Sequence, residues 1–255
     1  MSLKLNVVIL AAGKGTRMYS EKPKVLHELA GLSLVEHVIA AAKILNPENI
    51  TLVVGHQAED LESHLAEGGY NFVLQKEQKG TAHALEQALP FLDDNAYAII
   101  LYGDVPLTKK ASLEELIALT NESTMAVLTS VVKEPQGLGR IIRDDENNIE
   151  FIIEEKDANE RQKLIKEINT GIMAFPVKKL KDWLPLIKNN NSQNEFYLTD
   201  IVSLALEDKC QVKTSFCTYE YEAYGVNNMV QLAELEKIYQ QERASEYMLK
   251  GVKIS

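Results

Sequence analysis

The sequence predicts an α/β fold: a three-layer sandwich with a mostly parallel central sheet, and a small β-rich lobe in the second half. In the first half, short β-type runs alternate with amphipathic helical stretches, the order that produces parallel strands joined by crossover helices. Of the 255 residues, 45% are hydrophobic and 25% are charged, the balance of an ordinary globular chain. That length is enough to bury one large core.

The elements of the first half follow in a regular order. We predict strands at residues 6–10, 50–55, 72–75 and 97–101. We predict helices at 34–45, 58–65 and 81–89, where apolar residues recur at helical spacing. Ligands of parallel sheets bind beyond the carboxyl ends of the strands, so the loops after Leu10, Leu74 and Leu101 are expected to share one crevice.

The second half changes character. We predict strands at 125–132, 140–143, 149–153, 168–175 and 212–217, separated by turn signals, within a lobe at about 125–225. Helices are expected to return at Trp183 and Leu184, and a long amphipathic helix spans Met229 to Leu249. The expected division is a domain over 1–228 followed by a helical segment over 229–255.

Composition excludes several classes of partner. A formal charge of −10 argues against a nucleic-acid-binding surface, which needs a basic stripe. The sequence contains no apolar run of the roughly 20 residues that a membrane span needs, and no signal-peptide pattern at its start. The two cysteines, Cys210 and Cys217, have no histidine nearby and are expected to be plain reduced thiols. These observations predict a cytoplasmic protein.

A glycine-rich loop with basic side chains follows the first strand, from Leu10 to Met18. Gly13 and Gly15 allow the backbone to approach a ligand closely, and the amides beyond them can bind anionic oxygens. The spacing is not that of a P-loop, and Met18 stands where a dinucleotide-binding loop needs its third glycine. The loop therefore predicts a different phosphate site. Its cations are Lys14, Arg17, Lys22 and Lys24.

Two polar residues follow later strands. Asp104, in Tyr-Gly-Asp-Val-Pro, is placed to bind Mg²⁺ beside phosphates, although such a residue can also simply cap a turn. Gln75 carries an amide that suits the edge of a nucleobase, although a loop glutamine is more often merely solvated.

The chain shows no nucleophile of its own. The histidines at 27, 37, 56, 64 and 83 have neither metal-ligand spacing nor a catalytic companion and are interpreted as structural, and no Gly-x-Ser-x-Gly elbow is present. A substrate that brings an anionic nucleophile, such as a phosphate monoester, would need only alignment and charge neutralisation.

These motifs together resemble the sugar-phosphate nucleotidylyltransferases. The loop with Pro23-Lys24-Val25-Leu26-His27 matches their signature. Further segments resemble the N-acetylglucosamine-1-phosphate uridylyltransferases that form the N-terminal half of bifunctional bacterial enzymes. They are 78–84, 102–107, 167–171, 195–200 and 225–228, so the resemblance covers nearly the whole chain. It implies a Rossmann-like fold of the nucleotide-diphospho-sugar transferase type.

The resemblance also implies a role for each matching residue. The nucleotide would be wrapped by Leu10, Ala11, Ala12, Gly13 and Gly15, and the uracil contacted by Gln75, Gly80 and Thr81. Arg17 would neutralise the departing pyrophosphate, and Lys24 would lie at the reacting centre. Tyr102 and Gly103 would line the sugar-nucleotide side, and the sugar would be held by Gly139, Glu154, Asn169 and Tyr197. Asp104 and Asn227 would bind Mg²⁺, although without the resemblance Asn227-Asn228 is typical of a helix N-cap.

The implied reaction is Mg²⁺-dependent transfer of a uridylyl group from UTP to N-acetyl-α-D-glucosamine 1-phosphate. It yields UDP-N-acetylglucosamine and pyrophosphate, for cell-wall and lipopolysaccharide precursors. Nothing in the chain resembles the hexapeptide repeats of the bifunctional enzymes, so acetyltransferase activity and their trimerisation are expected to be absent. The alternatives are a relative that uses another nucleotide or sugar, and a non-catalytic nucleotide-sugar-binding module.

Overall fold

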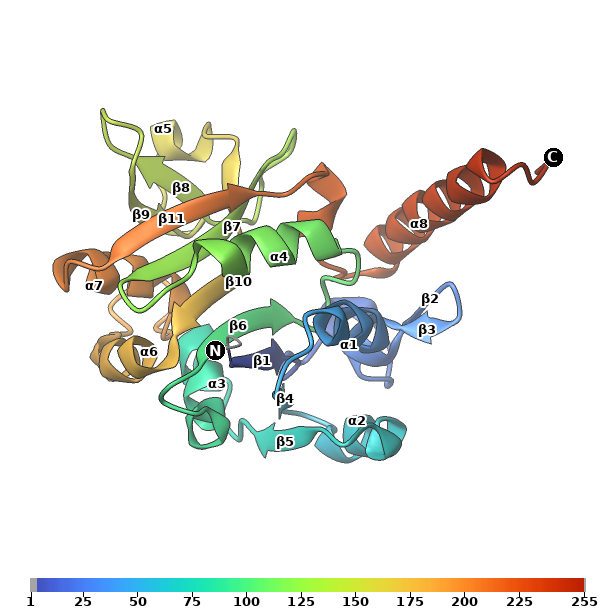
Figure 1. The fold of residues 1–255 in the computed structure, drawn as a ribbon, viewed down its shortest axis with the longest axis horizontal. Helices are drawn as coiled ribbons and strands as arrows, with labels where there is room; N and C mark the ends of the chain where they lie inside the picture. The colour runs from blue at the N-terminus through green and yellow to red at the C-terminus, as the bar shows by residue number, and fades with distance from the viewer. Residues whose placement is uncertain (1–3, 255) are drawn as a thin grey trace.

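The computed structural model describes residues 4–254, and its centre is one nine-stranded sheet (Figure 1). Strand β1 (Leu5–Leu10) lies in the interior of the sheet, and all six of its residues are buried. It pairs in parallel with β4 (Asn49–Val54) on one side and with β6 (Tyr97–Tyr102) on the other. Strand β5 (Asn71–Leu74) adds to β4, again in parallel. The predicted parallel sheet of the first half is confirmed.

The second half extends the same sheet through an antiparallel strand. Strand β10 (Glu167–Pro176) runs antiparallel to both β6 and β7 (Thr124–Val131). Strand β11 (Gln211–Phe216) then pairs in parallel with β7 at the sheet edge. The remaining two strands, β8 (Arg140–Arg143) and β9 (Ile149–Ile153), form a hairpin that branches from the main strand order through the pairing of β8 with β10. All five strands expected in the lobe thus belong to the one sheet, and only this hairpin lies off its main order.

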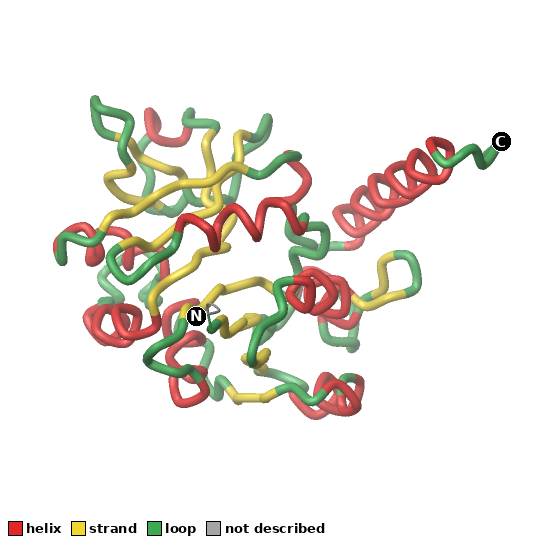
Figure 2. The backbone as a smooth tube through the Cα atoms, viewed as in Figure 1, coloured by secondary structure: helices red, strands yellow, loops and turns green. Residues whose placement is uncertain are grey.

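Helices cover both faces of the sheet, because successive strand residues point to opposite sides. On one face, α3 (Thr81–Ala88), α6 (Val177–Trp183) and α7 (Ile201–Glu207) pack around Val8 and Ile100. On the other face, α1 (Leu34–Ile44), α2 (Ala58–His64) and α4 (Lys110–Leu119) pack around Val7 and Ile9. The result is the predicted three-layer arrangement (Figure 2).

Helix α8 (Met229–Leu249) has the bounds that the sequence predicts, and it points away from the body of the molecule (Figure 1). Leu235 is its one buried residue, and it joins a small cluster with Met18 and Leu29. Leu29 belongs to a short hairpin of β2 (Glu28–Leu29) and β3 (Leu32–Ser33). None of the helices within residues 4–254 combines the length and the apolar character needed to cross a membrane.

The structure adds three helices that the sequence did not predict and corrects the place of a fourth. Helices α4 and α7 were not predicted, and neither has a side-chain hydrogen bond at its N-cap. The very short α5 (Glu160–Lys163) was also missed. Trp183 ends α6 rather than beginning the return to helices, because β10 runs directly into α6 at Pro176 with no turn residues between them.

The start of α1 yields a stability prediction. The Ser33 hydroxyl accepts from the Glu36 amide at 3.4 Å, and the Glu36 carboxylate accepts from the Ser33 amide at 2.8 Å. The Ser33 hydroxyl also donates to this carboxylate, and chiefly for that reason the pKa of Glu36 is lowered from 4.5 to about 2. Ser33→Ala should therefore reduce the free energy of unfolding by about 1 kcal/mol at neutral pH.

The same pKa predicts how this loss depends on pH. The folded pKa is depressed, so the stabilisation is present above pH 4.5 and disappears as the pH falls toward about 2. Urea unfolding of wild type and Ser33→Ala at pH 7 and pH 3 measures it, with a smaller difference expected at pH 3. An equal difference at both pH values would contradict this account of the cap.

Candidate functional site

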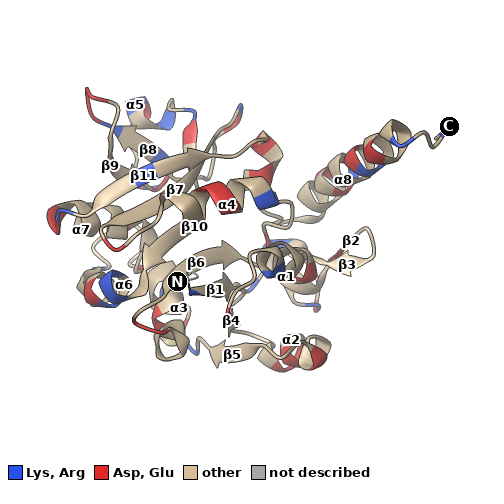
Figure 3. Cartoon of the chain, viewed as in Figure 1, with Lys and Arg blue, Asp and Glu red and all other residues tan. Residues whose placement is uncertain are grey.

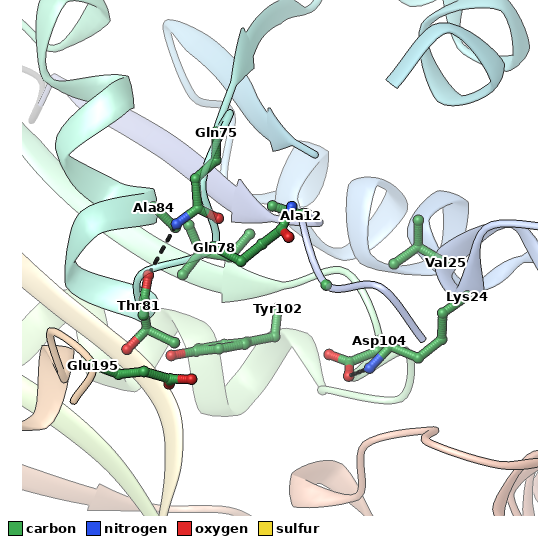
Figure 4. A pocket seen from close by; sticks show the side chains of 13 residues that line it. Ala12, Lys24, Val25, Gln75, Gln78, Thr81, Ala84, Tyr102, Asp104 and Glu195 are labelled. Carbon is green, nitrogen blue, oxygen red and sulfur yellow. Dashed lines mark hydrogen bonds and ion pairs between the residues drawn. The ribbon is translucent and has the colours of Figure 1, made fainter. Parts of the chain in front are cut away.

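A cavity of about 250 Å³ opens beyond the carboxyl ends of β1, β5 and β6, where the sequence predicts a shared crevice (Figure 4). The lining residues come from three loops, α3 and a distant segment at Glu195, and all but two of them, Gly13 and Gly80, carry a side chain. The lining comprises Leu10, Ala12, Gly13, Lys24, Val25, Gln75, Gln78, Gly80, Thr81, Ala84, Tyr102, Asp104 and Glu195. The cavity therefore brings together most of the residues predicted to contact a nucleotide.

The first loop is folded back on itself so that Lys24 lines the cavity, whereas Lys22 pairs with Glu28 at 3.3 Å. Gly15 has a left-handed backbone with φ +59°, and a Cβ atom there would lie 2.6 Å from Cβ of Lys24. Only glycine permits this approach, which packs the loop against the short helical turn beginning at Lys24. Arg17 lies in the intervening turn Thr16–Met18, anchored by the buried Met18.

Four side chains converge at one end of the cavity. The Lys24 ammonium donates to the Asp104 carboxylate and, at 3.3 Å, to Asn227 Oδ1. Arg17 Nη2 donates to the same Asn227 oxygen at 2.9 Å. Lys24 and Asp104 are only 12% and 18% exposed, so their charges interact with little screening by water. The arrangement joins the loop after β1, the loop after β6 and the segment before α8.

Asn227 and Asn228 divide the two roles that the sequence left open. Asn228 is the N-cap of α8, since its Oδ1 accepts from the Gln231 amide at 2.9 Å. The Asn227 amide donates to Gln231 Oε1, which leaves the Asn227 side chain directed toward Arg17 and Lys24. The preceding Val226 amide donates to the Asp104 carbonyl at 2.9 Å, so the backbone holds these two segments together.

The donor set at this end fits Mg²⁺. A carboxylate oxygen of Asp104 and the amide oxygen of Asn227 both contact the Lys24 ammonium, so one cation already lies between them. Mg²⁺ prefers such hard oxygens and takes its remaining ligands from phosphates and water. Among residues 4–254 no group of three or more His, Cys, Asp or Glu side chains is suited to hold a metal. Substrate oxygens would therefore have to complete the coordination.

The opposite end of the cavity is built around Gln75 and Gly80. Gln75 is 3% exposed, and its Nε2 donates to the Gly80 carbonyl at 3.1 Å (Figure 4). Gly80 has φ +116°, and a Cβ there would lie 2.4 Å from the carbonyl oxygen of Phe196. The Ala82 amide donates to that carbonyl, and the Leu198 amide donates to Thr81 Oγ1. The loop before α3 is thus fastened to the segment that carries Glu195.

The residues predicted to hold a sugar form a second group that does not line the cavity. The Asn169 amide donates to the Gly139 carbonyl at 2.9 Å, and a Cβ on Gly139 would lie 3.4 Å from the Glu154 carboxylate. Thr199 donates to Glu154 at 3.1 Å, while Tyr197 accepts from Gln193. The group therefore spans β8 to β10 and the segment before α7.

Tyr102 links the two groups. Burial, followed by the nearby charges of Glu154 and Asp104, raises the pKa of Tyr102, so it stays a neutral hydroxyl. A Cβ on Gly171 would overlap its ring, so Gly171 leaves room for it between the cavity and β10. Burial also raises the pKa of Glu154, because partial removal from water disfavours its charged form. A desolvated carboxylate is a strong acceptor for ligand hydroxyl groups.

Ala11, predicted to wrap a nucleotide, and Gly103, predicted to line the sugar-nucleotide side, are not among the residues that line the cavity. The Ala11 amide donates to the Val53 carbonyl, and the Gly103 amide donates to the Leu10 carbonyl. A Cβ on Gly103 would lie 3.3 Å from that of Ala11, so both residues form the close crossing beneath the cavity. Four lining residues had no predicted role, and all of them lie within segments that carry the family resemblance: Val25, Gln78, Ala84 and Glu195.

Charge is distributed unevenly in relation to this site. The chain carries a net charge of −10, and acidic side chains are spread over outer elements such as α2 and α8 (Figure 3). The loop after β1, however, contains basic residues and no acidic residue between Leu10 and Ser20. An anionic ligand would therefore be attracted to the cavity by local rather than overall charge.

Comparison with known proteins identifies the family. The model of the MobA-like NTP transferase domain matches residues 7–161, from β1 into α5. The chain belongs to this family of NTP transferases. The match contains the glycine-rich loop, Gln75 and Asp104, which are parts of the cavity or of the loops around it. Asn169, Tyr197 and Asn227 lie outside it.

Curated relatives match almost the whole chain. Three proteins named "Bifunctional protein GlmU" are 48% identical in Paraburkholderia phymatum, 46% in Marinobacter nauticus and 49% in Francisella tularensis subsp. novicida. Each alignment covers 98% of this chain and 55% of the relative. The chain therefore spans about half the length of the curated relatives that it matches.

Solved structures share the fold. A nucleotidyl transferase from Methanothermobacter thermautotrophicus superposes with a TM-score of 0.66 at 17% identity, covering 94% of this chain and 99% of that one. A Bacillus anthracis protein assigned as a glucose-1-phosphate thymidylyltransferase, solved with sucrose, gives 0.71 at 20% identity, covering 92% and 94%. The α/β architecture predicted from the sequence is confirmed by this likeness.

Gly80 provides a test of the cavity. Gly80→Ala would add strain of about 1–3 kcal/mol at φ +116° and drive its Cβ into the Phe196 backbone, which displaces the loop that carries the Gln75 contact. The dissociation constant for a nucleoside triphosphate, measured by calorimetry, should rise roughly tenfold or more. The matched control is Gly69→Ala, which has φ +67° and open space around the added Cβ. Unchanged affinity in Gly80→Ala would contradict a nucleotide site at this end.

Proposed function

We propose that this NTP transferase catalyses Mg²⁺-dependent uridylyl transfer from UTP to N-acetyl-α-D-glucosamine 1-phosphate, releasing UDP-N-acetylglucosamine and pyrophosphate. The observation that carries the proposal is the convergence of Arg17 and Lys24 on the oxygens of Asp104 and Asn227. The cavity that ends there also contains an oriented amide at Gln75. The high identity to proteins named GlmU supports this choice of nucleotide and sugar.

The residues of the chain have distinct tasks in this reaction. The backbone from Leu10 to Gly15 would surround the triphosphate, and Gln75 with Gly80 and Thr81 would contact the uracil. Gly139, Glu154, Asn169 and Tyr197 would hold the sugar, with Tyr102 between the two substrates. The sugar phosphate brings its own anionic oxygen as the nucleophile, so no general base is needed and alignment is the main requirement.

Charge neutralisation falls to the cluster at the end of the cavity. Lys24 would stabilise the charge on the α-phosphate as the entering oxygen attacks in line, and Arg17 would stabilise the departing pyrophosphate. Asp104 and Asn227 would hold the Mg²⁺, which supplies further charge neutralisation at the phosphates when bound. Entering phosphates would replace Asp104 and Asn227 as the hydrogen-bond partners of Lys24 and Arg17. Both cations would then bind the phosphates from the positions that they already occupy.

Wider consequences of the proposal follow the sequence-based expectations. Residues 1–228 would form the transferase domain, with the sugar held by the β-rich region at about 125–225, and residues 229–255 would form a helical extension. The product would serve cell-wall and lipopolysaccharide precursors, and the reaction would take place in the cytoplasm. UTP, the sugar phosphate, the nucleotide sugar and pyrophosphate are the expected partners, without nucleic acid or membrane.

A substrate panel tests the specificity. Purified protein is mixed with each of UTP, CTP, GTP and dTTP, and with N-acetylglucosamine 1-phosphate, glucose 1-phosphate or no acceptor, and pyrophosphate release is followed. The highest kcat/KM is expected for UTP with N-acetylglucosamine 1-phosphate in the presence of Mg²⁺. Preference for another nucleotide and sugar phosphate would show that the protein is a relative with different substrates. Binding without turnover in either direction would favour a non-catalytic module.

A pair of variants separates metal binding from direct charge stabilisation. Asp104→Ala removes the carboxylate from the cluster and should lower kcat at least about a hundredfold while circular dichroism shows an intact fold. Lys24→Met removes the ammonium that would stabilise the phosphate charge, so it should also lose turnover. Because this variant keeps the oxygens of Asp104 and Asn227, its activity should depend on the Mg²⁺ concentration as the wild type's does. Full activity of Asp104→Ala with unchanged Mg²⁺ dependence would refute the metal assignment.

A further inference from the structure

His83, which the sequence analysis interprets as structural, lies on α3 next to the amide at the base end of the cavity. Its Nδ1 is 3.0 Å from Gln75 Nε2. His83 follows Gly80 by three residues, so its side chain and the Gly80 carbonyl approach the same amide nitrogen from α3 and from the loop before it. The proposed reaction does not use the imidazole.

The two contacts determine which way the Gln75 amide faces. A backbone carbonyl can only accept a hydrogen bond, so the group 3.1 Å from the Gly80 oxygen must be the amide nitrogen. That nitrogen then donates its second proton to His83, whose Nδ1 must be unprotonated to accept it. Both protons of the Gln75 amide are therefore engaged by the protein.

The Gln75 oxygen is left for a ligand. In Figure 4 the nitrogen of Gln75 faces Gly80, and its oxygen faces away from that contact. No residue within the described range 4–254 donates a hydrogen bond to this oxygen, and Gln75 lines the cavity. A base that enters consequently meets an acceptor at this position and no free donor.

Uracil and cytosine differ at the atom that such an acceptor would contact. Uracil, like thymine, carries a hydrogen on ring nitrogen N3, whereas N3 of cytosine has a lone pair. A fixed acceptor pairs with the first and repels the second, so the orientation of one amide discriminates between the two pyrimidines. If the amide were free to rotate by 180°, it could present its nitrogen and satisfy cytosine equally well.

We propose that His83 is a positioning residue for base specificity: its unprotonated Nδ1 locks the Gln75 amide in the orientation that selects a pyrimidine with a hydrogen on N3. This inference rests on the proposed function, because it takes the base to bind beside Gln75. The Gly80 carbonyl is one hydrogen-bond partner that holds the amide in this orientation, and His83 is the second. Loss of His83 therefore leaves a single hydrogen bond to hold the orientation.

The test compares substitutions that keep or remove the acceptor. His83→Asn retains an oxygen acceptor near the position of Nδ1, while His83→Leu fills a similar volume without one, and His83→Ala is a second acceptor-free variant. Dissociation constants for UTP and CTP are measured by calorimetry without sugar phosphate, and kcat/KM is measured separately for each nucleotide. The KM for the sugar phosphate reports general damage to the site.

We expect the wild type to prefer UTP over CTP and His83→Leu and His83→Ala to reduce that preference roughly tenfold, as loss of one amide anchor would. His83→Asn should stay within about threefold of the wild type, and the sugar-phosphate KM should not change. An unaltered UTP-to-CTP ratio in the acceptor-free variants, or an equal loss of both nucleotides, would overturn the inference.

The two proposals fail in different ways. A wild type that transfers nucleotidyl groups but binds CTP as tightly as UTP overturns the role of His83 and leaves nucleotidyl transfer standing. A wild type that shows no transfer, yet binds UTP preferentially through His83, supports the positioning role and overturns the proposed reaction. The binding and turnover measurements therefore separate them.

Discussion

The parallel pairing of β1 on both of its sides is the constraint on which the site depends. Leu10, its last residue, lies opposite Val53 of β4 and Tyr102 of β6, so three strands end at one level. One more backbone hydrogen bond follows the last strand pair on each side of β1, from the Ala11 amide to the Val53 carbonyl and from the Gly103 amide to the Leu10 carbonyl. Every loop that leaves this edge must turn at the same place, which is why the phosphate loop, the Gln75 loop and Asp104 surround one cavity.

The cluster of Lys24, Asp104, Arg17 and Asn227 is better explained by function than by stability. A partly buried ion pair gains little net free energy, because removing both charges from water offsets their attraction. Here the contacts fix the positions of two flexible cations before any phosphate arrives. Groups that are already oriented need no rearrangement when charge develops, and such preorganisation is the main source of electrostatic catalysis.

The sequence predicted the parts of the molecule that depend on local order. The parallel half of the sheet, the bounds of α8 and the cavity at Leu10, Gln75 and Asp104 follow from alternation, periodicity and the rule on carboxyl ends of strands. Helices α4 and α7 were not predicted in this way, and in neither does the N-cap side chain accept a hydrogen bond from the first turn.

Contacts between distant segments lay beyond such reasoning. Asn227 is 203 positions from Lys24 in the sequence. Its neighbouring residues fit a helix N-cap as well as a metal ligand, and the N-cap role belongs to Asn228. Its place in the cluster was expected only from the family resemblance. His83 carries no motif at all, since its partner is a glutamine in the preceding loop, and only the folded arrangement reveals the contact.

The antiparallel strand β10 divides the site into two chemically different parts. The residues proposed to contact the phosphates and the base lie on the parallel side, whereas Gly139, Glu154 and Asn169 lie beyond Tyr102, where β8 and β10 meet. Proteins below 25% identity share this fold, so the fold alone does not determine the acceptor. The desolvated carboxylate of Glu154 opposes folding at neutral pH, because burial raises its pKa and its charged form is disfavoured. Under the proposed function, hydroxyl donors from a bound sugar would offset that cost, and Glu154 would then help to select the acceptor.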